Sequence, residues 1–434
     1  MYNLFTLDNG LRVVLEKIDY VKSISVGLWI ENGSRNENIK NNGISHFIEH
    51  MMFKGTENRS ALEIAECIED VGGQINAFTG KEATCYYVKI LNSHIELALD
   101  VLSDMLFNSK FKEEDIEKEK GVVVEEISMT EDSPEDVLSD LHCRAIWGGN
   151  DSISYPILGT VENVKSFKRK DIVDYINKYY IPQNTVISIC GNFDIIKLEK
   201  LISKYFSNWN SGENKNITSY SKPKIENNHL FKNKNIEQLH ISLGFEGLEL
   251  GNDDVYPLVL LSNVLGGGAS SILFQRIREE KGLCYSIYSY MSSFNNTGAV
   301  SIYTGLNSDY TEDTINLIKQ VVKDFSKEGI NKEKLIKSKE QLKGSYILGL
   351  ESTSTRMFNN GKSVLFLNRI NDPEIIMKKI DNITQDKLKE IMDRTFGAGI
   401  KNSAFVGEKL NIENVKNILE ENQKAFKETK SKLI

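Results

Sequence analysis

The chain has 434 residues, of which 40% are hydrophobic and 26% charged, and its formal net charge is −8. This composition is typical of a globular protein with room for two or three domains. The acidic balance argues against a nucleic-acid-binding protein, which usually carries a basic surplus. Five scattered cysteines without a C-x-x-C pair favour reduced thiols over a disulfide framework.

The N-terminal residues MYNLFTLDNGLRVVLEK contain no basic segment followed by an apolar run and no Arg-rich presequence. No apolar run in the sequence has the length that is needed to cross a bilayer. We therefore expect a cytoplasmic protein that has no membrane partner and no nucleic-acid partner.

Strand and helix patterns alternate irregularly in the first half of the chain. In chain order, the expected elements are strands over 11–16 and 23–30, helices over 44–53 and 60–71, a strand pair over 76–91, and helices over 95–107 and 113–129. The second helix has clear boundaries, because Ser60 and Glu63 form a capping box at its start and Gly72-Gly73 ends its pattern.

The polar, aperiodic stretch 213–228 is expected to link two halves of similar size, 1–212 and 229–434. The segment 24–28, ISVGL, is similar to the segment 241–245, ISLGF, and each leads through a polar loop into an apolar helical segment. This similarity indicates a weak internal repeat of a whole domain. Because strict βαβ alternation is missing, we expect two similar α+β domains, each with helices on one face of a mainly antiparallel or mixed sheet.

Residues 46–50, HFIEH, carry the strongest chemical signal in the sequence. His46 and His50 are four residues apart, so on a helix both imidazoles project from one face and can reach one metal ion. Glu49 lies near the same face, where a carboxylate can activate a water molecule at the metal. The order H-x-x-E-H is the inverzincin signature.

Two histidines do not complete a catalytic zinc site, which typically has three protein ligands and a fourth position for water. A carboxylate is therefore expected from elsewhere in the chain. The acidic cluster 113–126 contains Glu119 and Glu126, which are seven residues apart and so share one helix face. Glu125, the neighbour of Glu126, is the alternative ligand.

The stretches GISHFIEHMMFKGTENRS and EKEKGVVVEEI resemble the pitrilysin-type inverzincin zinc metallopeptidases. The sequence is most similar to the mitochondrial processing-peptidase β-subunit and its bacterial homologues, over nearly the whole chain. The family's third zinc ligand lies 76 positions after the second histidine, which is Glu126 here. The resemblance implies that His46, His50 and Glu126 bind one zinc ion per chain, that Glu49 is the catalytic general base, and that Glu119 supports the site.

The segment QINAFT after Gly72-Gly73 is a candidate substrate-binding strand. In the family, this strand is an exposed sheet edge that pairs with an extended substrate. Such strand addition gives affinity through backbone hydrogen bonds with little demand on sequence. The resemblance places Asn76 and Ala77 at this edge, near the scissile bond, whereas the pattern alone favours an ordinary hairpin strand.

The second half has no H-x-x-E-H motif, but it contains a glycine triplet, Gly266, Gly267 and Gly268. The triplet lacks the phosphate-binding P-loop pattern, and it resembles the family's glycine-rich loop, which helps to hold substrate. Arg278 and Tyr285 match an Arg/Tyr pair that binds substrate backbone in the family and stabilises the tetrahedral oxyanion. The alternative is a surface arginine and a strand tyrosine with no catalytic part.

In the family, two half-shells close around a chamber, and the Arg/Tyr pair of one shell serves the zinc site of the other. This chain has the length of one half of such a clamshell, so the resemblance implies a homodimer with Arg278 and Tyr285 supplied in trans. We expect a zinc-dependent, processing-peptidase-like endopeptidase that hydrolyses extended or unfolded peptides inside a dimeric chamber. The alternatives are the catalytic subunit of a heterodimer, or a non-catalytic structural or substrate-binding member of the fold.

Overall fold

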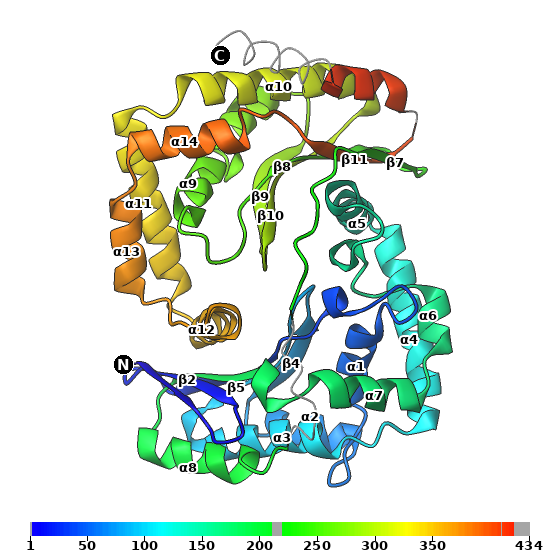
Figure 1. Ribbon diagram of the computed structural model, residues 1–434, viewed down its shortest axis with the longest axis vertical. Coiled ribbons are helices and arrows are strands. Elements are labelled where there is room, and N and C mark those ends of the chain that lie inside the picture. The colour runs from blue at the N-terminus through cyan, green and yellow to red at the C-terminus, as the bar shows by residue number, and fades with distance from the viewer. Residues whose placement is uncertain (1, 211–218, 409, 421–434) are drawn as a thin grey trace. The chain divides into compact units, whose positions relative to one another are not determined.

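The computed structural model describes residues 2–210, 219–408 and 410–420. Its internal contacts divide the chain into two compact units, each built around one β-sheet (Figure 1). None of the described helices is long and apolar enough to cross a membrane. Unit 1 comprises Met1–Met129, Tyr155–Ser219 and Tyr346–Asp372, and unit 2 comprises Thr130–Ser154, Tyr220–Ser345 and Pro373–Ile434.

These units differ from the two continuous halves, 1–212 and 229–434, that the sequence predicted. Helix α5 (Pro134–Trp147) comes from the first half but packs on the sheet of unit 2, whereas α12 (Thr353–Leu367) comes from the second half and packs on the sheet of unit 1. Helical periodicity shows that a helix has an apolar face but not which sheet covers that face. The sequence therefore could not show that α5 packs on the sheet of unit 2 and α12 on the sheet of unit 1. Part of the expected linker, residues 213–218, lies outside the described residues.

Unit 1 contains a mixed six-stranded sheet in the order β1-β2-β6-β3-β5-β4. Strands β2 and β6 are parallel, and the other neighbouring strands are antiparallel. Among the described strands, β4 pairs with β5 alone, so it forms one edge of the sheet. The strands are β1 (Tyr2–Thr6), β2 (Arg12–Lys17), β3 (Ser23–Ile30), β4 (Gln74–Thr79), β5 (Thr84–Leu91) and β6 (Thr185–Gly191).

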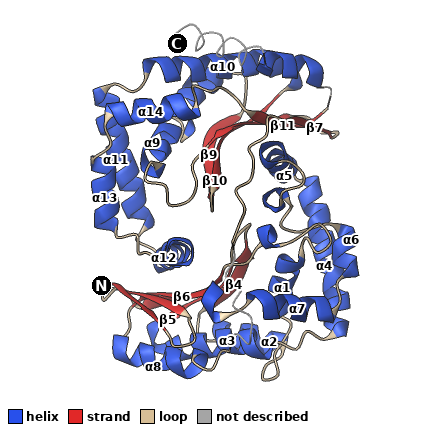
Figure 2. Ribbon diagram, in the orientation of Figure 1, coloured by secondary structure: helices blue, strands red, loops and turns tan. Residues whose placement is uncertain are grey.

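Helices cover the two faces of this sheet unequally (Figure 2). The main core lies on one face, where Phe47 of α1 and Leu102 of α3 belong to the same buried cluster as Ile24 of β3. On the other face, Met357 of α12 packs in a second cluster with Trp29. The helices of unit 1 are α1 (Ile44–Met52), α2 (Ala61–Glu69), α3 (Ile95–Asn108), α4 (Glu113–Asp132, which extends just beyond the unit), α6 (Val161–Ser166), α7 (Arg169–Tyr179), α8 (Ile195–Phe206) and α12.

Unit 2 contains a five-stranded sheet in the order β7-β11-β8-β10-β9, in which β7 and β11 are parallel and the other neighbours antiparallel. Val137 and Leu138 of α5 pack against Ala404 and Val406 of β11. The strands are β7 (His229–Asn233), β8 (Leu239–Glu246), β9 (Ser286–Phe294), β10 (Thr297–Leu306) and β11 (Asn402–Gly407). The helices that lie wholly or mainly in this unit are α5, α9 (Val255–Gly266), α10 (Thr311–Glu328), α11 (Lys332–Gly349), α13 (Pro373–Asp381) and α14 (Gln385–Thr395).

The two sheets repeat the same topology, in agreement with the predicted internal repeat. In order and direction, β2, β6, β3, β5 and β4 of unit 1 match β7, β11, β8, β10 and β9 of unit 2. The central strands β3 and β8 hold the two similar sequence segments. A Cβ on Gly27 of β3 would lie 2.2 Å from Met357 Sδ of α12, and a Cβ on Gly244 of β8 would lie 2.8 Å from His142 Nε2 of α5. Glycine at these two positions therefore allows α12 to approach β3 closely and α5 to approach β8 closely.

The elements predicted for the first half are present, with ends that shift by at most three residues. The capping box of α2 is also present, since the Ser60 hydroxyl accepts from the Glu63 amide at 3.3 Å and the Glu63 carboxylate accepts from the Ser60 amide at 2.7 Å. Strand β1 was not predicted. It pairs with β2 at the second edge of the sheet, where its residues are partly buried or exposed. Its short sequence, YNLFT, lacks the strong alternating pattern that predicts a strand.

Alanine at Gly361 of α12 should destabilise unit 1. A Cβ there would lie 2.2 Å from Trp29 Nε1, and the buried indole is held edge-on by Phe78 and Phe358. We expect a loss of about 1–3 kcal/mol in the free energy of unfolding, measured from urea transitions. Gly344→Ala on α11 is the matched control, because an added Cβ meets nothing within 4 Å there. Equal urea midpoints for the two variants would contradict the close packing of α12 on β3.

Candidate active site

Helix α1 presents the two histidines of the HFIEH motif side by side. Its apolar residues Phe47, Ile48 and Met51 are buried in the main core, which fixes the direction of the opposite face. The ring centroids of His46 and His50 are 4.6 Å apart. The four-residue spacing has therefore brought both imidazoles to one face, as predicted.

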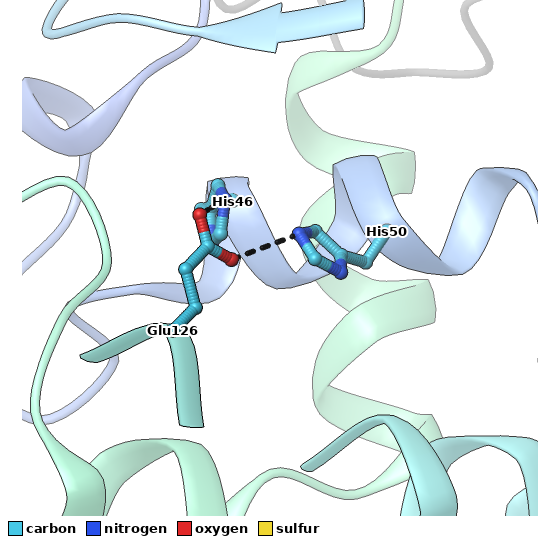
Figure 3. A group of neighbouring side chains, drawn as sticks. All are labelled: His46, His50 and Glu126. Atoms are coloured by element: carbon cyan, nitrogen blue, oxygen red, sulfur yellow. Dashed lines mark ion pairs between the residues drawn. The ribbon is translucent and has the colours of Figure 1, made fainter. Parts of the chain in front are cut away.

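Helix α4 brings Glu126 to this pair of imidazoles (Figure 3). One carboxylate oxygen of Glu126 lies 3.6 Å from His46 Nε2, and the other lies 3.4 Å from His50 Nε2. One donor atom from each of these three residues falls within 4.8 Å of the others. The neighbouring Glu125 is exposed and does not belong to this group. The geometry thus favours Glu126 over Glu125 as the third metal ligand.

The donor set fits a zinc ion. Two imidazole nitrogens and one carboxylate form the ligand combination of many catalytic zinc sites. The ring of His50 is oriented by a hydrogen bond of 2.8 Å between its Nδ1 and Glu119, which leaves Nε2 facing Glu126. Burial, followed by the nearby His50, lowers the pKa of His46 to about 4, so this imidazole is neutral at neutral pH. A neutral imidazole has the lone pair that a metal requires.

Glu119 connects His50 to a lysine that the sequence reasoning missed. Its second carboxylate oxygen lies 2.6 Å from Lys54 Nζ. Burial acts to raise the pKa of Glu119, but the hydrogen bonds from His50 and Lys54 outweigh it and bring the pKa below its ordinary value. Lys54 follows His50 by four residues but lies beyond the end of α1, so its closeness in the sequence was the available signal. The buried Glu119 is thus placed to orient a metal ligand.

Glu49 is held by Thr79, a second residue that the sequence reasoning missed. The Thr79 hydroxyl, at the end of strand β4, donates to Glu49 Oε2. Burial raises the pKa of Glu49, while the Thr79 hydrogen bond opposes this shift. Ile75 and Ala77 pack against the main core, and Thr79 lies on the same side of β4, the strand that contacts α1.

Strand β4 offers a free backbone edge beside α1. Its residues alternate between exposed and half-buried, and within the described part of the chain its one strand partner is β5. Asn76 is exposed and Ala77 half-buried. The Ala77 N–H donates to the side-chain oxygen of Asn76 at 2.8 Å. Both residues therefore lie on an edge that an extended chain can join, and their role in binding substrate stays a prediction.

Unit 2 brings Arg278 and Tyr285 together. The Arg278 guanidinium lies in the π-helix Phe274–Glu279 and stacks 4.5 Å from the ring centroid of Phe274 and 5.5 Å from that of Tyr285. Tyr285 is 77% exposed, so its hydroxyl is available to another molecule. The predicted pair is thus a local cluster rather than two separate surface residues, although its catalytic part stays a prediction.

The glycine triplet has packing roles at two of its three positions. A Cβ on Gly266 would lie 2.5 Å from the backbone nitrogen of Ser289, and a Cβ on Gly267 would lie 2.7 Å from Asn263 Cα. Gly268 is exposed, and a Cβ there would meet nothing within 4 Å. Close packing explains the first two glycines without a substrate, so Gly268 is the member of the triplet that is free to face one.

Family models match most of the chain. The model described as insulinase, peptidase family M16, matches residues 12–161, and the model described as the peptidase M16 inactive domain matches residues 166–342. An uncharacterized zinc protease of Bacillus subtilis, YmxG, is 43% identical over 396 residues, which cover 91% of this chain and 96% of the relative. The chain belongs to peptidase family M16. An uncharacterized zinc protease of Streptomyces coelicolor is 35% identical over 400 residues, covering 90% of this chain and 86% of the relative.

Solved structures share the two-domain α+β fold of this M16 chain. A protease from Helicobacter pylori superposes with a TM-score of 0.86 at 23% identity, and an M16 inactive-domain protein from Pseudomonas fluorescens with a TM-score of 0.87 at 17% identity. Each match covers 94% of this chain and 98% of the other. The predicted family and fold class are confirmed, and the names of the sequence relatives support a peptidase function. A special closeness to the processing-peptidase β-subunit stays a prediction.

The match of residues 166–342 to an inactive domain agrees with the distribution of metal-binding groups. Within the part of the chain that the structure describes, the cluster of three candidate ligands lies in unit 1, and unit 2 has no counterpart. The chemistry of this M16 member is therefore expected to centre on α1 and α4.

The two adjacent glutamates of α4 allow a matched test of the third ligand. We expect Glu126→Gln to lose stoichiometric zinc, because an amide is a poor replacement for a carboxylate ligand. Glu125→Gln should retain one zinc per chain, since Glu125 is exposed and outside the ligand group. Zinc content after dialysis against a weak chelator measures both. Loss of zinc from Glu125→Gln with retention in Glu126→Gln would reverse the assignment.

Proposed function

We propose that this protein is a zinc-dependent endopeptidase that hydrolyses extended or unfolded peptides. The observation that carries the proposal is the convergence of His46 and His50 of α1 with Glu126 of α4. Glu49 of α1 lies beside them and accepts a hydrogen bond from Thr79, at the end of the edge strand β4. In this proposal, the first three residues hold one zinc ion per chain. A bound zinc ion supplies Lewis-acid polarisation of the scissile carbonyl and acidifies the attacking water.

Other residues of unit 1 transfer the proton and position the ligands. Glu49 accepts the proton of the attacking water and passes it to the leaving amine. The Thr79 hydroxyl occupies one oxygen of this carboxylate, so the other oxygen is left for proton transfer. Glu119 and Lys54 keep the ring of His50 in a fixed orientation. These contacts hold the proton acceptor and the ligands in place before substrate arrives.

The proposed substrate is an extended peptide that adds to the edge of β4 at Asn76 and Ala77. Main-chain hydrogen bonds along a sheet edge bind an unfolded segment with little demand on its sequence. Because both residues lie on the strand that holds Glu49 through Thr79, a peptide paired with this edge would pass beside the general base. Folded proteins, whose strands are already paired, would be poor substrates.

The oxyanion donors in this proposal are Arg278 and Tyr285 of a second copy of the chain. A guanidinium and a phenol are both able to donate to a developing negative charge. Each chain carries one zinc site and one Arg/Tyr cluster, so a homodimer with two sites is the simplest assembly, and Gly268 would lie in the substrate-facing loop. A heterodimer predicts an inactive purified chain, and a non-catalytic role predicts no zinc-dependent cleavage.

Replacement of Glu49 tests the catalytic role directly. We expect Glu49→Gln to retain zinc and to lose about 10²- to 10⁴-fold in kcat on an unstructured peptide, because an amide does not accept the proton. Glu66→Gln, an exposed position on α2, is the control and should keep full activity. Wild-type turnover by Glu49→Gln would remove Glu49 from the mechanism.

A mixing experiment tests supply of Arg278 from the second chain. Chains carrying Glu49→Gln and chains carrying Arg278→Ala should each be weakly active alone. After exchange of subunits at equal concentrations, about one quarter of all sites would regain both residues, since half of the dimers are mixed and each holds one intact site. Activity that stays at the level of the separate variants, despite subunit exchange, would argue against a shared site.

A further inference from the structure

Helix α1 begins without a side-chain cap. Its N-cap residue is Gly43, which has φ of 100° and no side chain to accept from the first turn. The first backbone amides of a helix have no partner within the helix and need acceptors from elsewhere. Asn41 provides one of them, because its carbonyl oxygen accepts from the Ile44 amide at 3.1 Å.

Glu37 provides acceptors for two further amides from outside the helix. One of its carboxylate oxygens accepts from the Gly43 amide at 2.8 Å, and the other accepts from the Ser45 amide at 2.8 Å. The Asn42 side chain donates to the first of these oxygens at 2.8 Å. Glu37 is only 5% exposed, and no ion pair to it is found among the described residues. A buried carboxylate without a cation is costly to ionise. Burial accordingly raises the pKa of Glu37, and the hydrogen bonds from Gly43, Ser45 and Asn42 oppose this shift.

The residues around Glu37 connect this helix start to the sheet edge. Two residues earlier, the Arg35 amide donates to the carbonyl oxygen of Lys81 at 2.7 Å, in the turn between β4 and β5. On the helix side, the Ser45 hydroxyl lies 3.0 Å from the Tyr175 hydroxyl, which limits rotation of the first turn. One short segment thus touches both the turn after strand β4 and the residue that immediately precedes His46.

We propose that Glu37 is a positioning residue that sets the place of α1 relative to α4 and to the β4 edge, and thereby the spacing of His46 and His50 from Glu126. Zinc ligands must be held within a fraction of an ångström of their productive positions. A helix whose first turn is anchored by a buried carboxylate meets this requirement better than one that starts at an uncapped glycine. The proposal rests on the proposed zinc site.

The test compares Glu37→Gln with Glu16→Gln in the full-length chain. Glutamine has the shape of glutamate, but its amide group would face backbone N–H donors, so the first turn should loosen. We expect zinc affinity, measured by titration against a competing chelator, to fall about ten- to a hundred-fold. In the metal-free chain, amide hydrogen exchange should accelerate over residues 43–47. Glu16 is also buried and accepts hydrogen bonds from Arg356 and Asn360 of α12, so its variant reports general destabilisation of unit 1.

The outcomes separate this inference from the proposed function. Weaker zinc binding by Glu37→Gln, with zinc binding by Glu16→Gln unchanged, supports the inference. Equal zinc affinities of Glu37→Gln and wild type, or equal losses in both variants, overturn it. A wild-type chain that binds no zinc overturns the proposed function, and the exchange data on metal-free protein then decide the role of Glu37 alone. If Glu37→Gln does not fold, Asn42→Ala is the second variant, because it removes one hydrogen-bond donor to the Glu37 carboxylate. We expect Asn42→Ala to lose less zinc affinity than Glu37→Gln would. Zinc affinity of Asn42→Ala equal to that of wild type would then overturn the inference.

Discussion

The approach of Glu126 to the two imidazoles of α1 is the interaction on which the proposed chemistry of unit 1 depends. It adds a third carboxylate to a partly buried region that already contains Glu49 and Glu119. Like charges this close oppose one another more strongly where water is partly excluded. Lys54 compensates Glu119, and a bound divalent cation would compensate the remainder. The protein tolerates the arrangement because apolar residues on the other sides of α1 and α4 pack in the core and hold both helices in place.

The two units share a sheet topology but differ in the helix that follows the central strand. In unit 1, the helix that follows the central strand is α1, with two histidines and a glutamate on one face. In unit 2, the corresponding helix is α9, whose sequence VYPLVLLSNVLG offers no metal ligand and is mostly buried. Both units share the order of five strands and a glycine on the central strand. In each unit a helix packs closely against that glycine, α12 in unit 1 and α5 in unit 2. The candidate ligands of unit 1 come from α1 and α4, so the difference between the two copies lies in the side chains on these helices and not in the fold.

Local patterns made most of unit 1 predictable, including the capping box of α2 and the two histidines of α1. The spacing of Glu119 and Glu126 was also readable, because seven residues return to the same helix face. The contacts that were missed join residues that no helix or strand period relates: Thr79 to Glu49, Glu37 to the start of α1, and α12 to the sheet of unit 1. Periodicity reports which face of an element is buried but not what lies against it. The resemblance did not anticipate the close packing at Gly266 and Gly267, and the substrate-binding role of the glycine triplet stays a prediction.

Anomalous scattering at the zinc edge, from crystals of the wild-type chain grown with zinc, tests the central claim most directly. The account predicts one strong peak per chain, bonded to His46 Nε2, His50 Nε2 and the carboxylate of Glu126. It also predicts that Glu119 contacts His50 and not the ion. A peak bonded to Glu125, a peak elsewhere in the chain, or a site between α1 and α4 that stays without zinc would contradict it.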